Sequence, residues 1–125
     1  MVNKILIDTN VLLDYLLERE PFVEEAKEII RACTDGKVKG CIAAHSIPNM
    51  FFILRKDFDE KERREILLNL CKIFDIEGID KSYEADYIVT RNISDYDTSE
   101  IKAILPKDYL SQLEKTSTSM GGNML

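Results

Sequence analysis

The chain has 125 residues, which fits one domain, and its 45% hydrophobic and 32% charged residues are typical of a globular protein. Its formal net charge of −6 argues against a broad electropositive nucleic-acid surface, although the carboxylates of a metal site would also carry negative charge. No apolar run approaches the roughly 18 residues of a membrane-spanning helix. The opening MVNKILID does not fit a signal peptide. We therefore expect a cytoplasmic protein with no membrane partner.

Strands and helices are predicted to alternate along the first half of the chain. Short apolar runs predict buried strands, and apolar residues at helical spacing predict helices that bury one face. Pro21 suits the first turn of the second helix, Gly36 its end, and Ser46 the N-cap of the third. The elements expected here are a strand over 4–7, helices over 11–17 and 22–35, a strand over 38–44 and a helix over 47–56.

The second half is predicted to begin with a long amphipathic helix and to end in a tail. The small polar residues of TSTSMGGNML predict that this tail is flexible. We thus expect one domain over residues 1–115 and a flexible tail over 116–125. The other elements expected here are a helix over 59–74, strands over 76–79, 86–90 and 103–105, and a last helix over 107–113.

The alternation of strands and helices indicates an α/β sandwich with a mainly parallel sheet. The strands over 76–79 and 86–90 lie close together in the sequence for such a sheet. A parallel pair needs a crossover of about a dozen or more residues, and only residues 80–86 are available. A crossover helix is therefore expected to be missing. Three explanations stay open: the strands are antiparallel, one is not a strand, or a partner subunit supplies the element by swapping. A deletion in the gene would also explain the short connection.

Polar residues follow several of the predicted strands at the point where ligands of open parallel sheets gather. Asp8 follows the first strand, and Asp95 lies shortly after the strand DYIVT. Burying a carboxylate is costly unless it is paired, hydrogen-bonded or bound to a metal. Carboxylate oxygens suit Mg²⁺ or Mn²⁺, which would position a phosphodiester and lower the pKa of an attacking water. The alternative is that Asp8 caps the first helix and that Asp95 starts a turn.

Other polar and aromatic side chains have simpler interpretations. His45, the only histidine, is expected to satisfy a helix start. Arg91 follows a strand near the expected site and is a candidate phosphate contact. A basic cluster alternates with carboxylates, which favours a solvated helix face with i,i+4 pairs over an RNA track. The cluster comprises Arg55, Lys56, Lys61, Arg63 and Arg64, and the aromatic residues expected in the core are Tyr15, Phe51, Phe52 and Tyr87.

Two stretches of the sequence, IDTNVLLDYLLEREPF and DYIVTRNISDY, resemble the first and last signatures of PIN-domain proteins. These proteins are a family of metal-dependent nucleases that includes the ribonuclease toxins of bacterial toxin–antitoxin pairs. The order of elements between the signatures and the ending AILPKDYL are also similar, so the resemblance covers roughly residues 3–114. It implies a PIN-like three-layer α/β/α sandwich with a short, mainly parallel sheet, from which one crossover helix is missing.

The resemblance also implies a set of site residues. Asp8 matches the first metal-binding acid and Asp95 an acid of the last motif, so these two are the expected catalytic and metal-binding residues. Asn92 and Asn49 match positions that are acidic in many members, and they would be weaker ligands for Mg²⁺ or Mn²⁺. A further acid of the family lies in the segment that is missing here. The residues expected to bind substrate are Thr9, Asn10, Thr90 and Arg91.

Two functions therefore stay open for this sequence. The leading one is an Mg²⁺-dependent endoribonuclease that hydrolyses RNA phosphodiester bonds, with a toxin–antitoxin pair as its setting and a cognate antitoxin as its protein partner. The alternative is a catalytically impaired PIN-like module that acts by binding RNA or protein. The resemblance further implies a homodimer.

Overall fold

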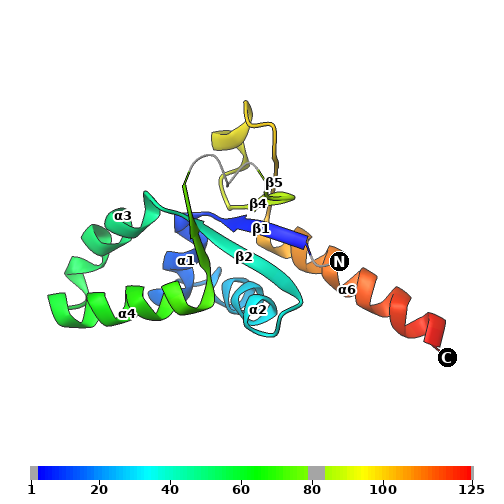
Figure 1. The fold of residues 1–125 in the computed structure, drawn as a ribbon, viewed down its shortest axis with the longest axis horizontal. Helices are drawn as coiled ribbons and strands as arrows, with labels where there is room; N and C mark the ends of the chain where they lie inside the picture. The colour runs from blue at the N-terminus through cyan, green and yellow to red at the C-terminus, as the bar shows by residue number, and fades with distance from the viewer. Residues whose placement is uncertain (1–2, 79–83, 125) are drawn as a thin grey trace.

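Five parallel strands form one sheet in the order β3-β2-β1-β4-β5 (Figure 1). The structure is a computed structural model that describes residues 3–78 and 84–124, and for 116–124 it describes the backbone alone. The central strand β1 pairs with β2 on one side, where Ile5 lies opposite Gly40, and with β4 on the other, where Ile5 lies opposite Tyr87. The strands are β1 (Asn3–Ile7), β2 (Val38–Ala43), β3 (Asp75–Glu77), β4 (Tyr87–Val89) and β5 (Lys102–Ile104).

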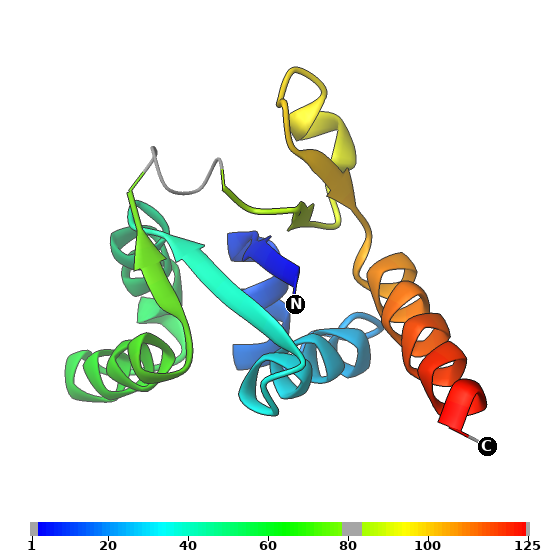
Figure 2. The same ribbon diagram turned by 45° about the vertical axis from the view of Figure 1, so that its right-hand side comes forward.

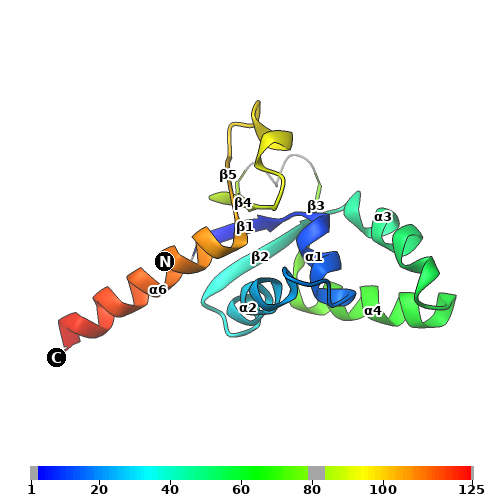
Figure 3. The same cartoon turned by 180° about the vertical axis from the view of Figure 1, so that it is seen from behind.

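Helices fill the connections between the first three strands and cover one face of the sheet. Figures 1 and 3 show α1, α2 and α4 on the same side of β1 and β2, with the segment between β4 and β5 on the other side. The helices are α1 (Thr9–Leu16), α2 (Val23–Thr34), α3 (Ser46–Ile53), α4 (Glu60–Ile73) and α6 (Pro106–Met124), with the short 3₁₀ turns η1 (Leu54–Lys56) and η2 (Ile93–Tyr96).

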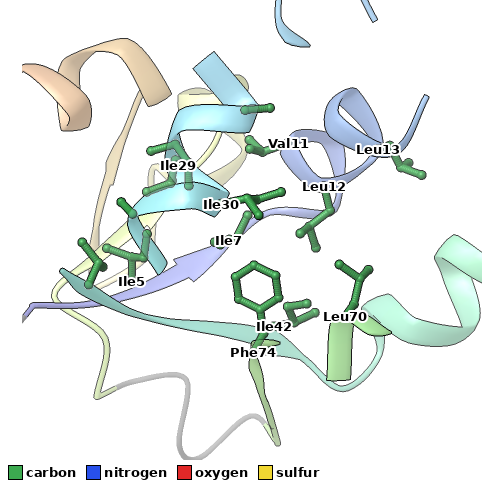
Figure 4. Close-up of a cluster of buried hydrophobic side chains, with 14 of the residues drawn as sticks. Ile5, Ile7, Val11, Leu12, Leu13, Ile29, Ile30, Ile42, Leu70 and Phe74 are labelled. Atoms are coloured by element: carbon green, nitrogen blue, oxygen red, sulfur yellow. The ribbon is translucent and has the colours of Figure 1, made fainter. Parts of the chain in front are cut away.

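The main core lies between the sheet and these helices. Alternate residues of β1, Ile5 and Ile7, point into it and are fully buried, as the period of two in a strand requires. Leu12 of α1, Ile29 of α2 and Leu70 of α4 pack against them (Figure 4). A smaller cluster on the opposite face contains Ala85, Ile88 and Ile101. The sheet therefore has one thickly covered face and one thinly covered face.

The strands β3 and β4 both exist and run parallel in one sheet, so two of the three explanations for their short connection are wrong. The strands are not neighbours, because β2 and β1 lie between them. Neighbouring strands lie about 4.8 Å apart, and an extended chain over 78–86 reaches up to about 30 Å. The connection is thus long enough to cross the sheet without a helix. Residues 79–83, including the predicted end of the third strand, lie outside the described residues.

The predicted α/β class is confirmed, and so is the predominance of parallel pairing. In the described part of the chain, the face opposite α1, α2 and α4 carries η2 and connecting segments instead of a second helical layer. The three-layer arrangement expected from the resemblance is therefore incomplete on this face.

The last helix, α6, is longer than the sequence predicts. It continues to Met124 instead of ending at residue 113, so residues 116–124 of the expected tail are helical. No proline follows Pro106 to stop the hydrogen-bonded turns. Figures 1 and 2 show the end of α6 projecting away from the rest of the protein. Among the described helices, none combines the length and apolar character needed to cross a membrane.

Candidate functional site

Asp8 lies at the carboxyl end of β1, directly before α1. Its backbone N–H donates to the carbonyl of Val89 at 3.0 Å, which fixes this residue where the two central strands end. Asp8 occupies the N-cap position of α1, but its side chain makes no capping hydrogen bond. The alternative in which this carboxylate caps the helix is therefore wrong, and the carboxylate has other partners.

Two hydroxyl groups hold the carboxylate of Asp8. Thr90 Oγ1 donates to Asp8 Oδ2 at 2.7 Å, and the Tyr96 hydroxyl donates to Asp8 Oδ1 at 3.1 Å. The backbone N–H of Asn92 in turn donates to Thr90 Oγ1 at 3.0 Å. Since Thr90 Oγ1 already accepts this bond, its own proton is directed at Asp8. Both donors are neutral, so the negative charge of Asp8 is oriented by them but not cancelled.

The Tyr96 hydroxyl stays protonated well above neutral pH. Burial raises the pKa of Tyr96, and the charge and hydrogen bond of Asp8, followed by the charge of Asp95, raise it further. Tyr96 is thus a dependable donor to Asp8. Sequence reasoning missed this role. The available signal was that a half-buried tyrosine usually finds a partner for its hydroxyl, and that Tyr96 directly follows Asp95.

A cavity of about 590 Å³ opens beside Asp8 on the thinly covered face of the sheet. Its walls combine apolar side chains, including those of Leu6 and Ile88, with a polar rim. Asp8, Ser46 and Tyr96 belong to that rim. A concave site with apolar walls and a few convergent polar groups is the usual form of a ligand site.

Glu77, at the end of β3, also lines this cavity. The Lys4 ammonium lies 2.7 Å from Glu77 Oε1, and both side chains are largely buried. Glu77 Oε2 is buried and has no hydrogen-bond partner among the described residues. Glu77 was not predicted as a site residue because it lies inside the strand expected over 76–79. In the structure β3 ends at Glu77, which places this residue at the carboxyl end of a strand, where ligands gather.

The other predicted metal-binding residues do not gather around Asp8. Asp95 lies exposed in η2, directly before Tyr96, and its charge adds to that of Asp8 in raising the pKa of the Tyr96 hydroxyl. Asn92 starts η2 and contacts the site through its backbone. Asn49 lies exposed on α3. The structure therefore places Asp95 and Asn92 near the partners of Asp8, and Asn49 on the outer surface.

The first turns of α1 and α3 are joined by a hydrogen bond from Thr9 Oγ1 to Ser46 Oγ at 2.8 Å. Ser46 is buried as the first residue of α3, while His45 occupies the N-cap position and makes no capping bond with its side chain. The predictions that Ser46 caps this helix and that His45 satisfies its start are therefore wrong. Asn10 is half-buried beside Thr9.

Arg91 points to the helix-covered side of the sheet. Its Nε and Nη2 lie 2.6 and 3.1 Å from the two carboxylate oxygens of Asp14, which is fully buried in α1. Its guanidinium also stacks on the ring of Phe22 at 3.9 Å. This bidentate pair ties the end of β4 to α1. Arg91 thus has a structural partner, which disfavours the predicted phosphate contact.

The residues around Asp8 offer few ligands to a divalent metal. In the described part of the chain, no group of three or more histidine, cysteine or acidic side chains is placed to hold a metal ion. Mg²⁺, however, keeps several waters and often uses only one or two carboxylates together with substrate phosphates. Asp8 supplies one such carboxylate. The site therefore fits a metal ion that binds weakly and takes its further ligands from water and substrate.

A comparison with protein families supports the assignment of the fold. The model of the PIN domain matches residues 4–86, which is more than half of the chain and includes Asp8 and Asn49. The match ends before Thr90 and Tyr96. A comparison with curated proteins found no match. The parallel sheet, the acid at the end of β1 and this match lead to one conclusion: the chain belongs to the PIN-domain family and has a nuclease-like fold.

Proposed function

We propose that this protein is an endoribonuclease that hydrolyses RNA phosphodiester bonds with Mg²⁺ or Mn²⁺ held at Asp8. The observation that carries the proposal is the environment of Asp8. Its carboxylate is oriented by Thr90 and Tyr96, serves neither as a helix cap nor in an ion pair within the described residues, and lines a cavity. A carboxylate that is held in place beside a cavity and has no cationic partner there is better suited to bind a cation than to stabilise the fold.

Each residue of the site has a distinct role in this proposal. Asp8 holds the metal, and a bound metal supplies an activated water and positive charge that offsets the phosphate in the transition state. Thr90 and Tyr96 position the carboxylate, as hydrogen-bonding partners of metal ligands commonly do. Asp95 adds negative charge nearby, and Asn92 offers a neutral oxygen as a weaker helper. Thr9 and Asn10 are the proposed substrate contacts at the start of α1.

Membership of the PIN-domain family also suggests a biological setting. We propose a cytoplasmic homodimer that acts as the toxin of a toxin–antitoxin pair, with a cognate antitoxin as its protein partner. Light scattering of the purified protein gives its molar mass in solution, and the mass of a monomer would reject the homodimer. Coexpression with the protein encoded by a neighbouring gene tests the second partner, and failure to copurify would remove that candidate.

The proposed chemistry is tested by cleavage of a labelled single-stranded RNA in Mg²⁺, in Mn²⁺ and in a chelator. We expect cleavage that needs the metal and that falls by at least about 100-fold in Asp8→Asn, the size of loss typical for removing one electrostatic group from a site. Asp35→Asn, which neutralises an exposed carboxylate after α2, is the matched control and should cleave normally. Cleavage that survives in Asp8→Asn would exclude Asp8 from the mechanism.

A second candidate function is a PIN-domain module that binds RNA or protein without cleaving. One observation favours it, namely that the described residues assemble no group of three metal-binding side chains. The same assay separates the two candidates. RNA binding with no cleavage in either metal, at millimolar concentrations that saturate weak sites, would support the binding module and reject the nuclease.

A further inference from the structure

The outer surface of α3 carries an aromatic ring stacked with a cation and open to solvent. Phe52 is 59% exposed, and the Arg55 guanidinium lies 3.7 Å from the centre of its ring. Arg55 Nη1 also donates to the Phe52 carbonyl at 2.8 Å, which holds the guanidinium in place. The prediction that Phe52 belongs to the core is therefore wrong. Phe51, by contrast, packs against the core as expected.

The cations near Phe52 are less neutralised than the sequence predicts. Arg64 forms the expected i,i+4 pair with Glu60 at 2.7 Å. In the described part of the chain, no ion pair joins Arg55 or Lys56 to a carboxylate, and both are exposed. Only part of the basic cluster is therefore neutralised by ion pairs within the protein. Arg55 and Lys56 are available to bind an external anion.

Two of the carboxylates in this region, those of Asp59 and Glu62, accept hydrogen bonds from backbone N–H groups and form no ion pair within the described residues. Asp59 Oδ1 accepts from the backbone N–H of Glu62 at 2.8 Å, and Glu62 Oε1 accepts from that of Asp59 at 3.1 Å. This reciprocal capping box starts α4. Arg63, meanwhile, stacks on Phe51 at 4.2 Å. Two acids that the sequence placed against the cations are thus used by the helix end.

The α3 helix connects this surface with the cavity at Asp8. Ser46, its first residue, lines the cavity, and Phe52 follows about 9 Å further along the helix axis. Asn49 and Phe52 share one side of α3 because they are three residues apart, and both are exposed. We name Asn49 and Phe52 of α3, together with Arg55 and Lys56 of the following turn η1, the α3 ridge. Its first residue, Asn49, lies one helical turn after the cavity-lining Ser46.

We propose that the α3 ridge binds the single-stranded RNA that the Asp8 site cleaves, an inference that rests on the proposed function. A base stacks on the open face of Phe52, while Arg55 and Lys56 contact the flanking phosphates. The ridge offers an exposed ring and cations without paired carboxylates, so its partner should present flat apolar faces and negative charge together. Single-stranded nucleic acid has both, and stacking on aromatic rings is the usual way in which it is bound.

Fluorescence anisotropy with a short labelled single-stranded RNA tests the ridge in the full chain. A chelator and the Asp8→Asn background prevent cleavage. Phe52→Leu keeps an apolar side chain but removes the ring. We expect the affinity for RNA to fall by roughly 5- to 150-fold, which corresponds to the usual free energy of stacking one base on an aromatic ring. Phe52→Trp should bind at least as tightly as the wild type. Leu68→Ala changes an equally exposed apolar residue on α4, 62% exposed, and should leave binding unchanged.

The salt dependence of the same binding separates stacking from charge. Arg55→Gln and Lys56→Gln should each lower the slope of log affinity against log salt by about 0.7, the value for one phosphate contact on a single strand. Phe52→Leu should weaken binding with an unchanged slope. Arg64→Gln, which removes a cation already paired with Glu60, is the control and should change neither quantity strongly.

The outcomes distinguish this inference from the proposed function. Wild-type binding in Phe52→Leu, an equal loss in Leu68→Ala, or no RNA binding by the wild type would overturn the ridge. Cleavage that depends on Asp8 but not on Phe52 would overturn the ridge and leave the nuclease standing. Binding that depends on Phe52 without any cleavage that depends on Asp8 would support the ridge and reject the nuclease.

Discussion

Thr90 donates a 2.7 Å hydrogen bond to Asp8 across a sequence separation of 82 residues. The two residues follow β4 and β1, which pair in parallel at the centre of the sheet. Thr90 is fully buried, whereas Asp8 is half-buried and lines the cavity, so the hydroxyl is shielded from water while the carboxylate faces the site. The site therefore depends on the register of two strands from opposite ends of the chain.

Replacing Thr90 by valine should weaken both the fold and the site. Valine matches threonine in shape, so the change removes the hydroxyl without opening a cavity. We expect a loss of about 1.5–3 kcal/mol in the free energy of unfolding, the range for a hydrogen bond to a charged group. Urea unfolding measures this loss. Thr34→Val, which removes an exposed hydroxyl bonded to the Arg31 carbonyl, should stay within about 0.5 kcal/mol of the wild type.

The same substitution should lower RNA cleavage under conditions where the protein remains folded. Asp8 would keep only the Tyr96 hydroxyl as an orienting donor. Loss of such a partner typically lowers metal affinity or activity by about 10- to 100-fold. Raising the metal concentration should recover part of the activity. Unchanged cleavage in Thr90→Val would show that this hydrogen bond serves stability alone.

Only those site residues that are marked by their immediate neighbours in the sequence could be predicted. Asp8 was identified because a strand, an acid and a helix follow one another within a few residues. Tyr96 and Glu77 were not, because their roles arise from contacts between elements that the sheet topology brings together. Arg91 shows the limit of the strand-end rule. Arg91 does follow a strand, as predicted, but its side chain pairs with Asp14, which lies 77 residues earlier in the sequence.

Tyr96 should make the fold sensitive to alkaline pH. Burial and the charge of Asp8 raise its pKa above the ordinary value near 10. A group whose pKa is raised by folding stabilises the protein below its unfolded pKa and loses that contribution as pH rises above it. We expect the urea midpoint to fall from about pH 10 upwards, and to fall less steeply in Tyr96→Phe.

Other buried groups contribute to the alkaline decline in both proteins. Burial raises the pKa of the Cys33 and Cys41 thiols to about 12. The difference between the wild-type and Tyr96→Phe curves therefore reports Tyr96, while their common slope includes the thiols. Parallel curves would contradict the proposed environment of the Tyr96 hydroxyl.

Removing Arg91 should destabilise the protein far more than removing a surface arginine. The carboxylate of Asp14 is 1% exposed, so Arg91→Ala would leave a buried charge without its bidentate partner. Such a loss typically amounts to about 3–5 kcal/mol. Arg19, whose Nη1 lies 3.9 Å from Asp14, should offset part of it. Arg64→Ala breaks an exposed pair and should change stability by less than about 1 kcal/mol.

The Arg91 prediction also decides the role that the sequence suggested for this residue. A folded Arg91→Lys variant keeps the positive charge but loses the bidentate geometry. If Arg91 is structural, this variant should lose stability and keep the wild-type salt dependence of RNA binding. A lower salt slope in a stable Arg91 variant would instead support the phosphate contact.

Gly40 should tolerate no side chain, because β2 passes close to α2 and to the end of α4. A Cβ atom at this position would lie 2.7 Å from Cys33 Sγ and 2.7 Å from Phe74 Cδ1. Both neighbours belong to or pack against the main core, so the strand or the helices would have to shift. We expect Gly40→Ala to lower the free energy of unfolding by about 1–3 kcal/mol, the usual effect of overpacking a core.

Two further variants make the Gly40 prediction specific to this contact. Gly78→Ala adds the same methyl group where no atom of the other described residues lies within 4 Å, and its stability should stay within about 0.5 kcal/mol of the wild type. Cys33→Ala removes one of the two colliding side chains. Combined with Gly40→Ala it should recover part of the loss, so that the two effects are not additive. Additive losses in the double variant would mean that β2 and α2 do not approach each other as closely as Gly40 requires.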